Sequence, residues 1–456
     1  MNRVASRSTI AMMLVVVLLG GMCLFLTEYM MKADDWVVFE GSPHVYNGTN
    51  IGCGEITDRG GELLLSATDQ RTYSTDSGIR KSTLHWLGDR YGYISANAVS
   101  GYAGEMTGFG LINGLYGYGG TGGKAEMTIS AQVQKVALEA LGKKKGTVAV
   151  YNYKTGEIFC AVTTPTYDPD DVLKIDESQD RYEGIYLNRF TQVSYVPGSV
   201  FKIITAAAAL DSLDNAQEMT FRCDGVYEMS GGKVKCTGEH GKIDLKKALQ
   251  KSCNCYFAQL SQVLGGKTLS RYVEKFRITE PVSFDGITTA KGSFSIEGAS
   301  DQQVAWAAIG QHQDTINPCR FLTFLGAIAG GGEAAEPYIV SYAGAGMFGG
   351  HRASKTSTGR IMEKDTAEAI TTLLRNNVEQ QYGDDHFPGL TVCAKSGTAE
   401  VGGDKKPNAV FGGFCTDSRY PLAFVVVVED AGSGSKTCIP IISEVLAACK
   451  DMLDQE

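Results

Sequence analysis

Residues 197–210 read PGSVFKIITAAAAL, and this stretch predicts the centre of the fold. Proline and glycine are typical of a helix start, and the Ala/Ile/Leu run after them is apolar enough to be buried in a domain. Ser199 then lies in the first turn of the helix, with Lys202 three residues later on the same face. We therefore expect a helix over residues 199–210 that holds a hydroxyl and an amine side by side.

This pairing is typical of nucleophilic catalysis. A serine hydroxyl is a weak nucleophile until a base removes its proton. A lysine in apolar surroundings has a lowered pKa, because burial disfavours the ammonium, so Lys202 is a candidate base for Ser199. The N-terminus of the helix also stabilises negative charge that develops near Ser199.

Two later patterns complete a recognisable order. Ser252-Cys253-Asn254 follows a short helical segment, and Lys395-Ser396-Gly397 ends a strand-like run. With Ser199-x-x-Lys202 they give the order SxxK, SxN and KTG of serine β-lactamases and penicillin-binding proteins, with serine replacing threonine in the third motif. Ser252 would relay a proton from Lys202 and Asn254 would orient Lys202 and the substrate amide. The alternative is that Ser252 and Asn254 only cap a junction between two helices.

The third motif predicts a binding edge for substrate. Lys395 and the hydroxyls of Ser396 and Thr398 are suited to a substrate carboxylate, and Gly397 lets a backbone approach closely. All three patterns also recur elsewhere, at Ser230–Lys233, Ser433–Lys436, Ser95–Asn97 and Lys154–Gly156. We expect no helix around Ser230 or Ser433, which lie among glycine and serine, and we expect Lys154–Gly156 to be the turn of a hairpin.

The surrounding pattern predicts an α/β fold of the α+β type, in which one sheet takes strands from both ends of the sequence. Expected helices cover residues 130–141, 245–263, 318–329 and 440–453, and expected strands cover 147–151, 157–162, 409–414 and 422–428. Residues 28–125 are polar and glycine-rich, which predicts a loop-rich module in front of this domain.

The N-terminus predicts a membrane anchor. Residues 9–26 are apolar or glycine except Thr9, and eighteen helical residues span about 27 Å, close to the thickness of a bilayer core. Arg3 and Arg7 precede this run and acidic residues follow it, so we expect residues 1–8 in the cytoplasm, an anchor at 9–27 and the remainder outside. The alternative is a cleaved signal, although its apolar region would usually be only ~7–15 residues long.

Composition excludes some functions and leaves the cysteines open. The chain has 42 Lys and Arg against 51 Asp and Glu and no basic block, so we expect no nucleic-acid partner. None of the 6 histidines lies in a common metal-binding pattern, so we expect no metal and no cofactor. Of the 12 cysteines, Cys223 and Cys236 are the best disulfide candidates, and most others suit buried free thiols.

From about Gly52 onward the chain resembles the class B penicillin-binding proteins, most of all the penicillin-binding protein A type. The matching stretches are 57–63 (TDRGGEL), 128–134 (TISAQVQ), 146–150 (GTVAV), 164–169 (TPTYDP), 188–190 (NRF), 240–241 (HG), 309–311 (IGQ) and 394–400 (AKSGTAE), besides the three motifs. The resemblance implies a β-lactamase-like transpeptidase domain at 126–456, with a central antiparallel sheet flanked by helices, and a small pedestal domain at 28–125.

The same resemblance implies the chemistry. Ser199 would attack the penultimate D-Ala carbonyl of a peptidoglycan stem peptide that ends in D-Ala-D-Ala, backbone N–H groups of Ser199 and Thr398 would form an oxyanion hole, and a neighbouring amine would complete the cross-link. β-Lactams would trap Ser199, and a polytopic membrane glycosyltransferase is a candidate partner. A D,D-carboxypeptidase, a β-lactamase and a non-enzymatic membrane β-lactam sensor or scaffold remain alternatives.

Overall fold

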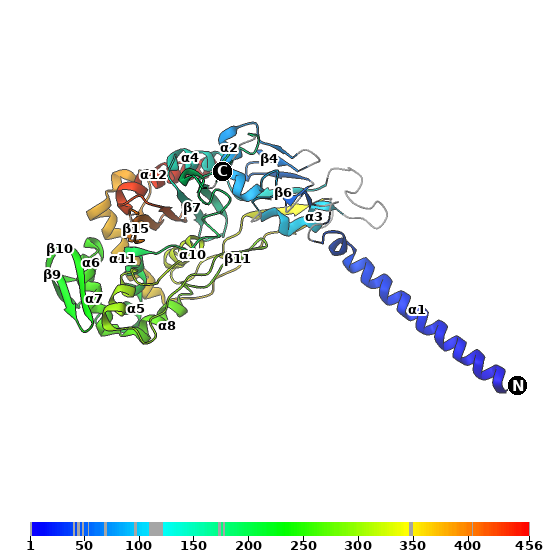
Figure 1. Cartoon of the computed structure of the whole chain (residues 1–456), viewed down its shortest axis with the longest axis horizontal. Helices are drawn as coiled ribbons and strands as arrows, with labels where there is room; N and C mark the ends of the chain where they lie inside the picture. Colours follow the sequence, from blue (N-terminus) through cyan, green and yellow to red (C-terminus); the bar gives the residue numbers. More distant parts are fainter. Residues whose placement is uncertain are drawn as a thin grey trace.

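The computed structural model describes residues 2–455 apart from 40–41, 43–45, 48–49, 53, 68–70, 95–97, 109–121, 172–174, 177, 346–349 and 404. The second SxN pattern, at Ser95–Asn97, therefore lies outside the described residues, as does most of the glycine-rich stretch before residue 123. A long helix, α1 (Asn2–Val37), projects from the body of the protein and carries the N-terminus at its far end (Figure 1). Within it, Val4–Ala33 contains an apolar 18-residue window that is not buried and is long enough to cross a membrane, which fits a single-pass anchor.

A five-stranded antiparallel sheet forms the centre of the larger domain. Its order is β15 (Val392–Ala399), β16 (Asn408–Cys415), β17 (Leu422–Val428), β7 (Gly146–Asn152) and β8 (Ile158–Thr164). β17 pairs with β7, so the sheet joins the two ends of the domain, as the sequence predicted. The strands are rich in valine, alanine and phenylalanine, and such apolar runs suit a sheet that is buried on both faces.

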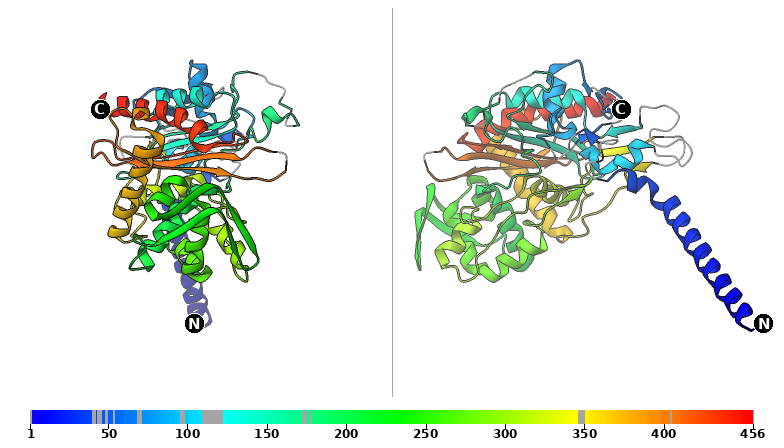
Figure 2. Two further views of the ribbon diagram at one scale, coloured as in Figure 1. Left: turned by 90° about the vertical axis from the view of Figure 1, so that its left-hand side faces the viewer. Right: turned by 45° about the vertical axis from the view of Figure 1, so that its right-hand side comes forward.

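Side chains alternate between the two faces of this sheet and build a core on each. In β17, Phe424 and Val426 pack on the face covered by α4 (Ala131–Leu141) and α12 (Gly434–Gln455). Val425 and Val427 pack into the other core, beneath α10 (Pro318–Ala329). Figure 2 shows this layering, with a helical lobe below the sheet.

The helical lobe carries most of the helices between the two halves of the sheet. They are α5 (Lys202–Ser212), α6 (Leu245–Lys251), α7 (Asn254–Leu264), α8 (Gly266–Lys275), α9 (Asp301–Ala308) and α11 (Lys364–Asn377), with the hairpin β9 (Thr220–Met229) and β10 (Gly232–Asp244) at its outer edge. α10 begins at Pro318 behind an Asn317 N-cap and has the predicted bounds.

Three predicted helices differ in detail from the observed ones. The helix expected over 245–263 is two helices, because Ser252 ends α6 in a left-handed conformation and Cys253 caps α7. The nucleophile segment begins as a 3-10 helix, Gly198–Phe201, before α5. The last helix starts at Gly434 and continues through Pro440, so the expectation that no helix lies beside Ser433 is wrong.

Close packing explains the early start of α12. A Cβ atom on Gly434 would collide with the carbonyl oxygen of Gly397 in β15, so the Gly-Ser composition that suggested a loop instead lets the helix start against the sheet. Ser433 O accepts a hydrogen bond from Thr437 N at 3.1 Å, which closes the first turn.

A second, mixed sheet belongs to the smaller domain. Its order is β14 (His351–Arg352), β13 (Val340–Gly344), β6 (Lys124–Met127), β3 (Glu55–Thr57), β4 (Leu63–Ser66) and β5 (Thr72–Tyr73). β6 pairs in parallel with β3 and antiparallel with β13, so segments far apart in sequence share this sheet. The boundary predicted between residues 125 and 126 falls inside β6. The remaining α-helices and strands of the described residues are β1 (Tyr46–Asn47), β2 (Asn50–Ile51), α2 (Ser77–Leu87), α3 (Ala103–Thr107), β11 (Ser283–Phe284) and β12 (Ile287–Thr288).

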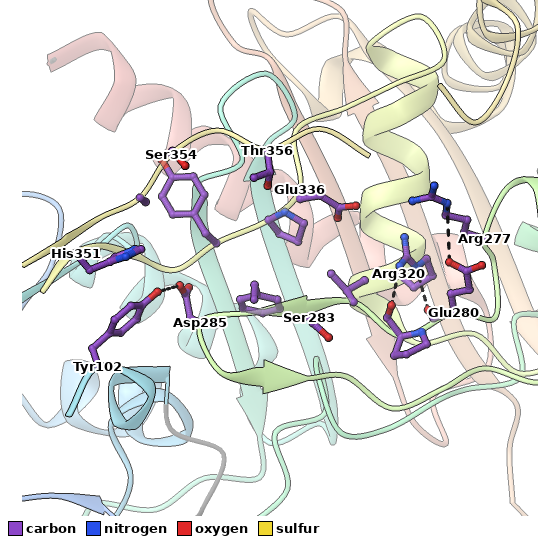
Figure 3. Close-up of a pocket in the computed structure, with 16 residues that line it drawn as sticks. Tyr102, Arg277, Glu280, Ser283, Asp285, Arg320, Glu336, His351, Ser354 and Thr356 are labelled. Atoms are coloured by element: carbon purple, nitrogen blue, oxygen red, sulfur yellow. Dashed lines mark hydrogen bonds and ion pairs between the residues drawn. The ribbon is translucent and has the colours of Figure 1, made fainter. Parts of the chain in front are cut away.

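Asp285 holds the junction between the smaller domain and the lobe (Figure 3). It lies in the tight turn between β11 and β12 at a φ of 48°, and one carboxylate oxygen accepts hydrogen bonds from the backbone N–H groups of Ile339 (2.6 Å) and Val340 (3.1 Å). The other oxygen accepts from the hydroxyl of Tyr102, whose ring lies 4.5 Å from that of His351. One carboxylate thus connects three separate segments.

We predict that Asp285→Gly destabilises this junction. Glycine adopts a positive φ without strain, so the substitution removes only the carboxylate and leaves buried N–H and O–H groups without a partner. The expected loss is about 2 kcal/mol, measured as a lowered Tm of the full-length protein in detergent by scanning fluorimetry. Asp385→Gly, at an exposed position of the short 3-10 helix Asp384–His386, is the control and should leave the Tm nearly unchanged. Equal Tm values for the two variants would contradict this role of Asp285.

Candidate active site

The segment that carries Ser199 is pressed against the edge strand β15. Gly198 has a φ of 56°, and a Cβ atom there would lie 2.6 Å from the carbonyl oxygen of Thr398. Gly198 N also donates a hydrogen bond to Gly310 O at 3.0 Å. Only glycine satisfies both the left-handed conformation and the close approach, so Pro197-Gly198 fixes the half-buried Ser199 beside β15.

Lys202 is the central side chain of the site. It is fully buried on the first turn of α5, and its Nζ lies 3.1 Å from Ser199 Oγ. Nζ also donates to Asn254 Oδ1 and to the backbone oxygen of Ser252, each at 2.7 Å. The amine therefore joins the first motif to the second, with Asn254 as one of its acceptors.

Ser252 connects both motifs to the third. Its hydroxyl oxygen lies 3.2 Å from Lys202 Nζ and 3.1 Å from Lys395 Nζ. Ser252 has a left-handed backbone conformation, with a φ of 53°, and its hydroxyl contacts both amines. The result is a continuous chain of polar groups from Ser199 through Lys202 and Ser252 to Lys395, assembled from three distant segments.

Burial changes the proton affinity of the two amines. It lowers the pKa of Lys202 to about 8. Burial also lowers the pKa of Lys395 well below its usual value, and the neighbouring Lys202 ammonium lowers it further. Because two adjacent cations are disfavoured in this dry site, a neutral amine is accessible near Ser199 at moderate pH, as a general base requires.

The third motif presents alternate residues to opposite sides of β15. Lys395 points to Ser252, whereas Ser396 Oγ hydrogen-bonds to the hydroxyl of Tyr382 at 2.9 Å, and the same hydroxyl accepts from Ser396 N at 2.9 Å. Thr398 is exposed, and its Oγ1 accepts from Gly434 N at 3.4 Å. No sequence pattern points to Tyr382, which ends a π-helical segment, Val378–Tyr382, after α11.

The packing around residue 397 leaves no room for a side chain. A Cβ atom there would lie 2.8 Å from Pro197 O and 3.1 Å from Val200 Cγ1. The sequence predicts that this glycine admits a substrate backbone, whereas its close neighbour in the structure is the segment that carries Ser199. Gly397 and Gly198 thus let β15 and the 3-10 helix come into contact on both sides of the site.

The repeated patterns lie elsewhere. Ser230 lies in the turn between β9 and β10, Lys233 lies near the start of β10, and Ser433 directly precedes α12. Lys154-Thr155-Gly156 is the turn between β7 and β8, where the backbone N–H groups of Lys154 and Thr155 donate to Asn152 Oδ1 at 2.9 and 3.1 Å. That pattern serves the hairpin, as expected.

The disulfide expected between Cys223 and Cys236 is wrong. Both residues are free thiols. Their Sγ atoms lie 3.5 and 3.6 Å from His240 Nδ1, so the histidine lies between them and a third cysteine, Cys253, completes the group. This group adjoins the second motif and is considered separately below.

Comparison with known proteins agrees with this geometry. Residues 146–447 match the penicillin binding protein transpeptidase domain. The chain is 27% identical over 361 residues to the peptidoglycan D,D-transpeptidase PbpA of Mycolicibacterium smegmatis, covering 72% of each chain.

Solved structures show the same fold. The penicillin G acyl-enzyme complex of penicillin-binding protein A from M. tuberculosis superposes with a TM-score of 0.75 at 24% identity, covering 88% of this chain and 99% of that one. A complex between PBP2 and MreC of Helicobacter pylori gives a TM-score of 0.62 at 21% identity over 72% and 64% of the two chains.

We predict that modification of Ser199 by a β-lactam accelerates as pH rises. Below the Lys202 pKa of about 8 the amine is protonated and cannot accept the serine proton, so the rate falls by up to tenfold per pH unit. The second-order rate constant of labelling by a fluorescent penicillin, measured between about pH 6 and about pH 9, should rise and then level off. Circular dichroism across the same range controls for unfolding, and a flat profile would exclude Lys202 as the base.

Proposed function

The chain belongs to the penicillin-binding protein transpeptidase family, and from this premise we propose that it is a membrane-anchored peptidoglycan D,D-transpeptidase. The observation that carries the proposal is the buried chain of polar groups in which Lys202 Nζ contacts Ser199 Oγ and Ser252 Oγ contacts both Lys202 and Lys395. Its residues are those that acyl transfer to a serine requires: a nucleophile, a buried amine as base and a hydroxyl that relays a proton.

In the proposed acylation, Lys202 takes the proton of Ser199 as Oγ attacks the penultimate D-Ala carbonyl of a stem peptide. The negative charge on the carbonyl oxygen is stabilised by the backbone N–H groups of Ser199 and Thr398. The proton then passes from Lys202 through Ser252 to the nitrogen of the terminal D-Ala, which leaves as a free amino acid. The second half reverses these roles: the amine of a neighbouring strand loses a proton to the same base and attacks the ester, which forms the cross-link and frees Ser199.

The third motif would bind the end of the substrate. Lys395 places an amine that can donate hydrogen bonds beside Ser252, and the exposed Thr398 is available to a substrate carboxylate. Ser396 would contribute mainly through position, since its hydroxyl lies against Tyr382. Gly397 would keep this edge close to Ser199, and Asn254 would hold both Lys202 and the substrate amide.

The proposed topology follows from the anchor. We place residues 1–8 in the cytoplasm, residues 9–27 in the cytoplasmic membrane, and a pedestal at 28–125 and the catalytic domain at 126–456 outside. Arg3 and Arg7 before the apolar run support this orientation. A membrane-bound glycosyltransferase that polymerises the glycan strand remains the proposed partner. The H. pylori structure shows a family member in complex with another protein, MreC.

The alternative functions all use an acyl-enzyme on Ser199 and differ in the molecule that cleaves its ester bond. Water resolves it in a D,D-carboxypeptidase or a β-lactamase, and nothing resolves it in a sensor. The similarity to PbpA over 72% of both chains supports an amine acceptor, because that relative is named a D,D-transpeptidase.

We predict that Ser199→Ala abolishes covalent labelling of the full-length protein by a fluorescent penicillin, because it removes the hydroxyl that forms the ester in the proposed mechanism. Ser230→Ala and Ser433→Ala are matched controls, since each removes the serine of a repeated SxxK pattern. Both should label at the wild-type rate, as measured by in-gel fluorescence. Labelling that persists in Ser199→Ala would reject the assigned nucleophile.

We predict that the acyl-enzyme prefers an amine to water. The detergent-solubilised protein is given a stem-peptide donor ending in D-Ala-D-Ala together with a D-amino acid, and the products are separated by mass spectrometry. The exchanged peptide should exceed the hydrolysed peptide and should disappear in Ser199→Ala. A product formed only with water would make the protein a carboxypeptidase, and an acyl-enzyme that never turns over would make it a sensor.

A further inference from the structure

Three cysteines and a histidine converge behind the second motif. The Sγ atoms of Cys223, Cys236 and Cys253 and a ring nitrogen of His240 all lie within 4.8 Å of one another. Cys223 and Cys253 are buried, while Cys236 and His240 are partly exposed. Four soft donor groups that face a common point are the ligand set of a structural zinc site.

Three distances within this group match those of a tetrahedron around a single ion. Zn–S bonds of about 2.3 Å and Zn–N bonds of about 2.0–2.1 Å, at tetrahedral angles, place two sulfurs about 3.8 Å apart and a sulfur and a nitrogen about 3.6 Å apart. Cys236 Sγ lies 3.8 Å from Cys253 Sγ. His240 Nδ1 lies 3.5 Å from Cys223 Sγ and 3.6 Å from Cys236 Sγ. Each of these distances matches an edge of that tetrahedron, whereas a disulfide would need bonded sulfurs about 2.05 Å apart.

The backbone is shaped to bring these ligands together. The regular pairing of β9 and β10 is interrupted between Lys235 and Glu239 and again between Glu239 and Gly241. Such irregularities redirect side chains that would otherwise alternate between faces, and here they flank Cys236 and His240. Cys223 lies on β9 beside Gly241, and Cys253 is the N-cap of α7.

Backbone donors support the thiolates. Asn254 N donates to Cys236 Sγ at 3.3 Å, and Tyr256 N donates to Cys253 Sγ at 3.4 Å. N–H groups aimed at sulfur stabilise the deprotonated form that binds metal and hold each ligand in place. Cys255 is different: its Sγ is directed to Val234 O at 3.9 Å, so it is not needed as a ligand.

We propose that Cys223, Cys236, His240 and Cys253 bind one zinc ion, which fastens the β9–β10 hairpin to the start of α7. Four protein ligands fill a tetrahedral shell and leave no position for water or substrate, so the ion is structural and takes no part in acyl transfer. This revises the expectation from sequence that the chain has no metal site.

The site has a consequence for catalysis that rests on the proposed function. Cys253 is flanked by Ser252 and Asn254, which both contact Lys202. An ion bound to Cys253 thus restricts the positions of Ser252 and Asn254, because both are bonded to Cys253 through the backbone. Asn254 is also held by a hydrogen bond from its Nδ2 to Lys235 O at 2.9 Å. The four ligands are positioning residues for the catalytic motif.

Metal content tests the site itself. The full-length protein, purified in detergent under reducing conditions and incubated with Zn²⁺, should contain about one zinc per chain by plasma mass spectrometry. Cys236→Ala should lose the ion, whereas Cys438→Ala, a buried cysteine on α12, should retain it. His240→Cys keeps four soft ligands and should also retain metal, so loss of metal is separable from misfolding. Absence of zinc in the wild type, or a Cys223–Cys236 disulfide under these conditions, would overturn the proposal.

Spectroscopy and kinetics test the consequence. Co²⁺ in place of zinc should give the intense visible bands of a tetrahedral thiolate site, and these should disappear in Cys236→Ala. Chelation should lower the Tm and slow penicillin acylation of Ser199 by about 10–100-fold, and added Zn²⁺ should restore both. An unchanged acylation rate after the ion is removed would refute the positioning role. Failure of the zinc-loaded wild type to acylate would instead contradict the proposed function, because the metal content is measured independently.

Discussion

The active site depends on the burial of one amine. Lys202 has no exposed surface, and moving an ammonium from water into a protein costs several kcal/mol unless its hydrogen bonds are replaced. The replacement comes from oxygen atoms of Ser199, Ser252 and Asn254, which lie on two segments about fifty residues apart. Lys202 can be buried only because these oxygen atoms accept its hydrogen bonds. Its burial in turn lowers its pKa, which allows the amine to act as a base. The same contacts therefore stabilise this part of the fold and position the groups of the active site.

Glycine packing makes that arrangement possible. Gly198 and Gly397 face each other's segments across the contact between the 3-10 helix and β15, and Gly434 admits the start of α12 to the same strand. A Cβ atom at Gly198 or Gly397 would collide with the backbone of the opposite segment and force the 3-10 helix and β15 apart. The sheet also supplies rigidity, because β15 is held by β16 along its whole length and the core strands are buried on both faces.

Much of this could be predicted from sequence, and the exceptions share a cause. Residues 318–329 and 422–428 have the predicted bounds because their caps, apolar spacing and β-branched content are local signals. Ser199, Lys202, Ser252 and Lys395 meet as expected because each lies at a recognisable local motif. Tyr382, the helix beside Ser433 and the partners of Cys223 depend on contacts between segments far apart in the chain. A sequence pattern carries no trace of a β-bulge that turns two side chains to the same side.

The second motif shows how two networks share one turn. Ser252 adopts a left-handed conformation between α6 and α7, which directs its hydroxyl and its carbonyl oxygen to Lys202, while the next residue, Cys253, points to the sulfur cluster. The two residues are adjacent in a short turn, so few backbone conformations allow both sets of contacts. Restricting the position of Cys253 therefore also restricts the position of Ser252. The hairpin β9–β10 also contacts the residue after Cys253. Cys236 Sγ accepts a hydrogen bond from Asn254 N, and Lys235 O accepts one from Asn254 Nδ2. The position of the hairpin and the position of the second motif therefore depend on each other. An ion at the cluster would stabilise both at once, from a position where it never contacts the reacting atoms.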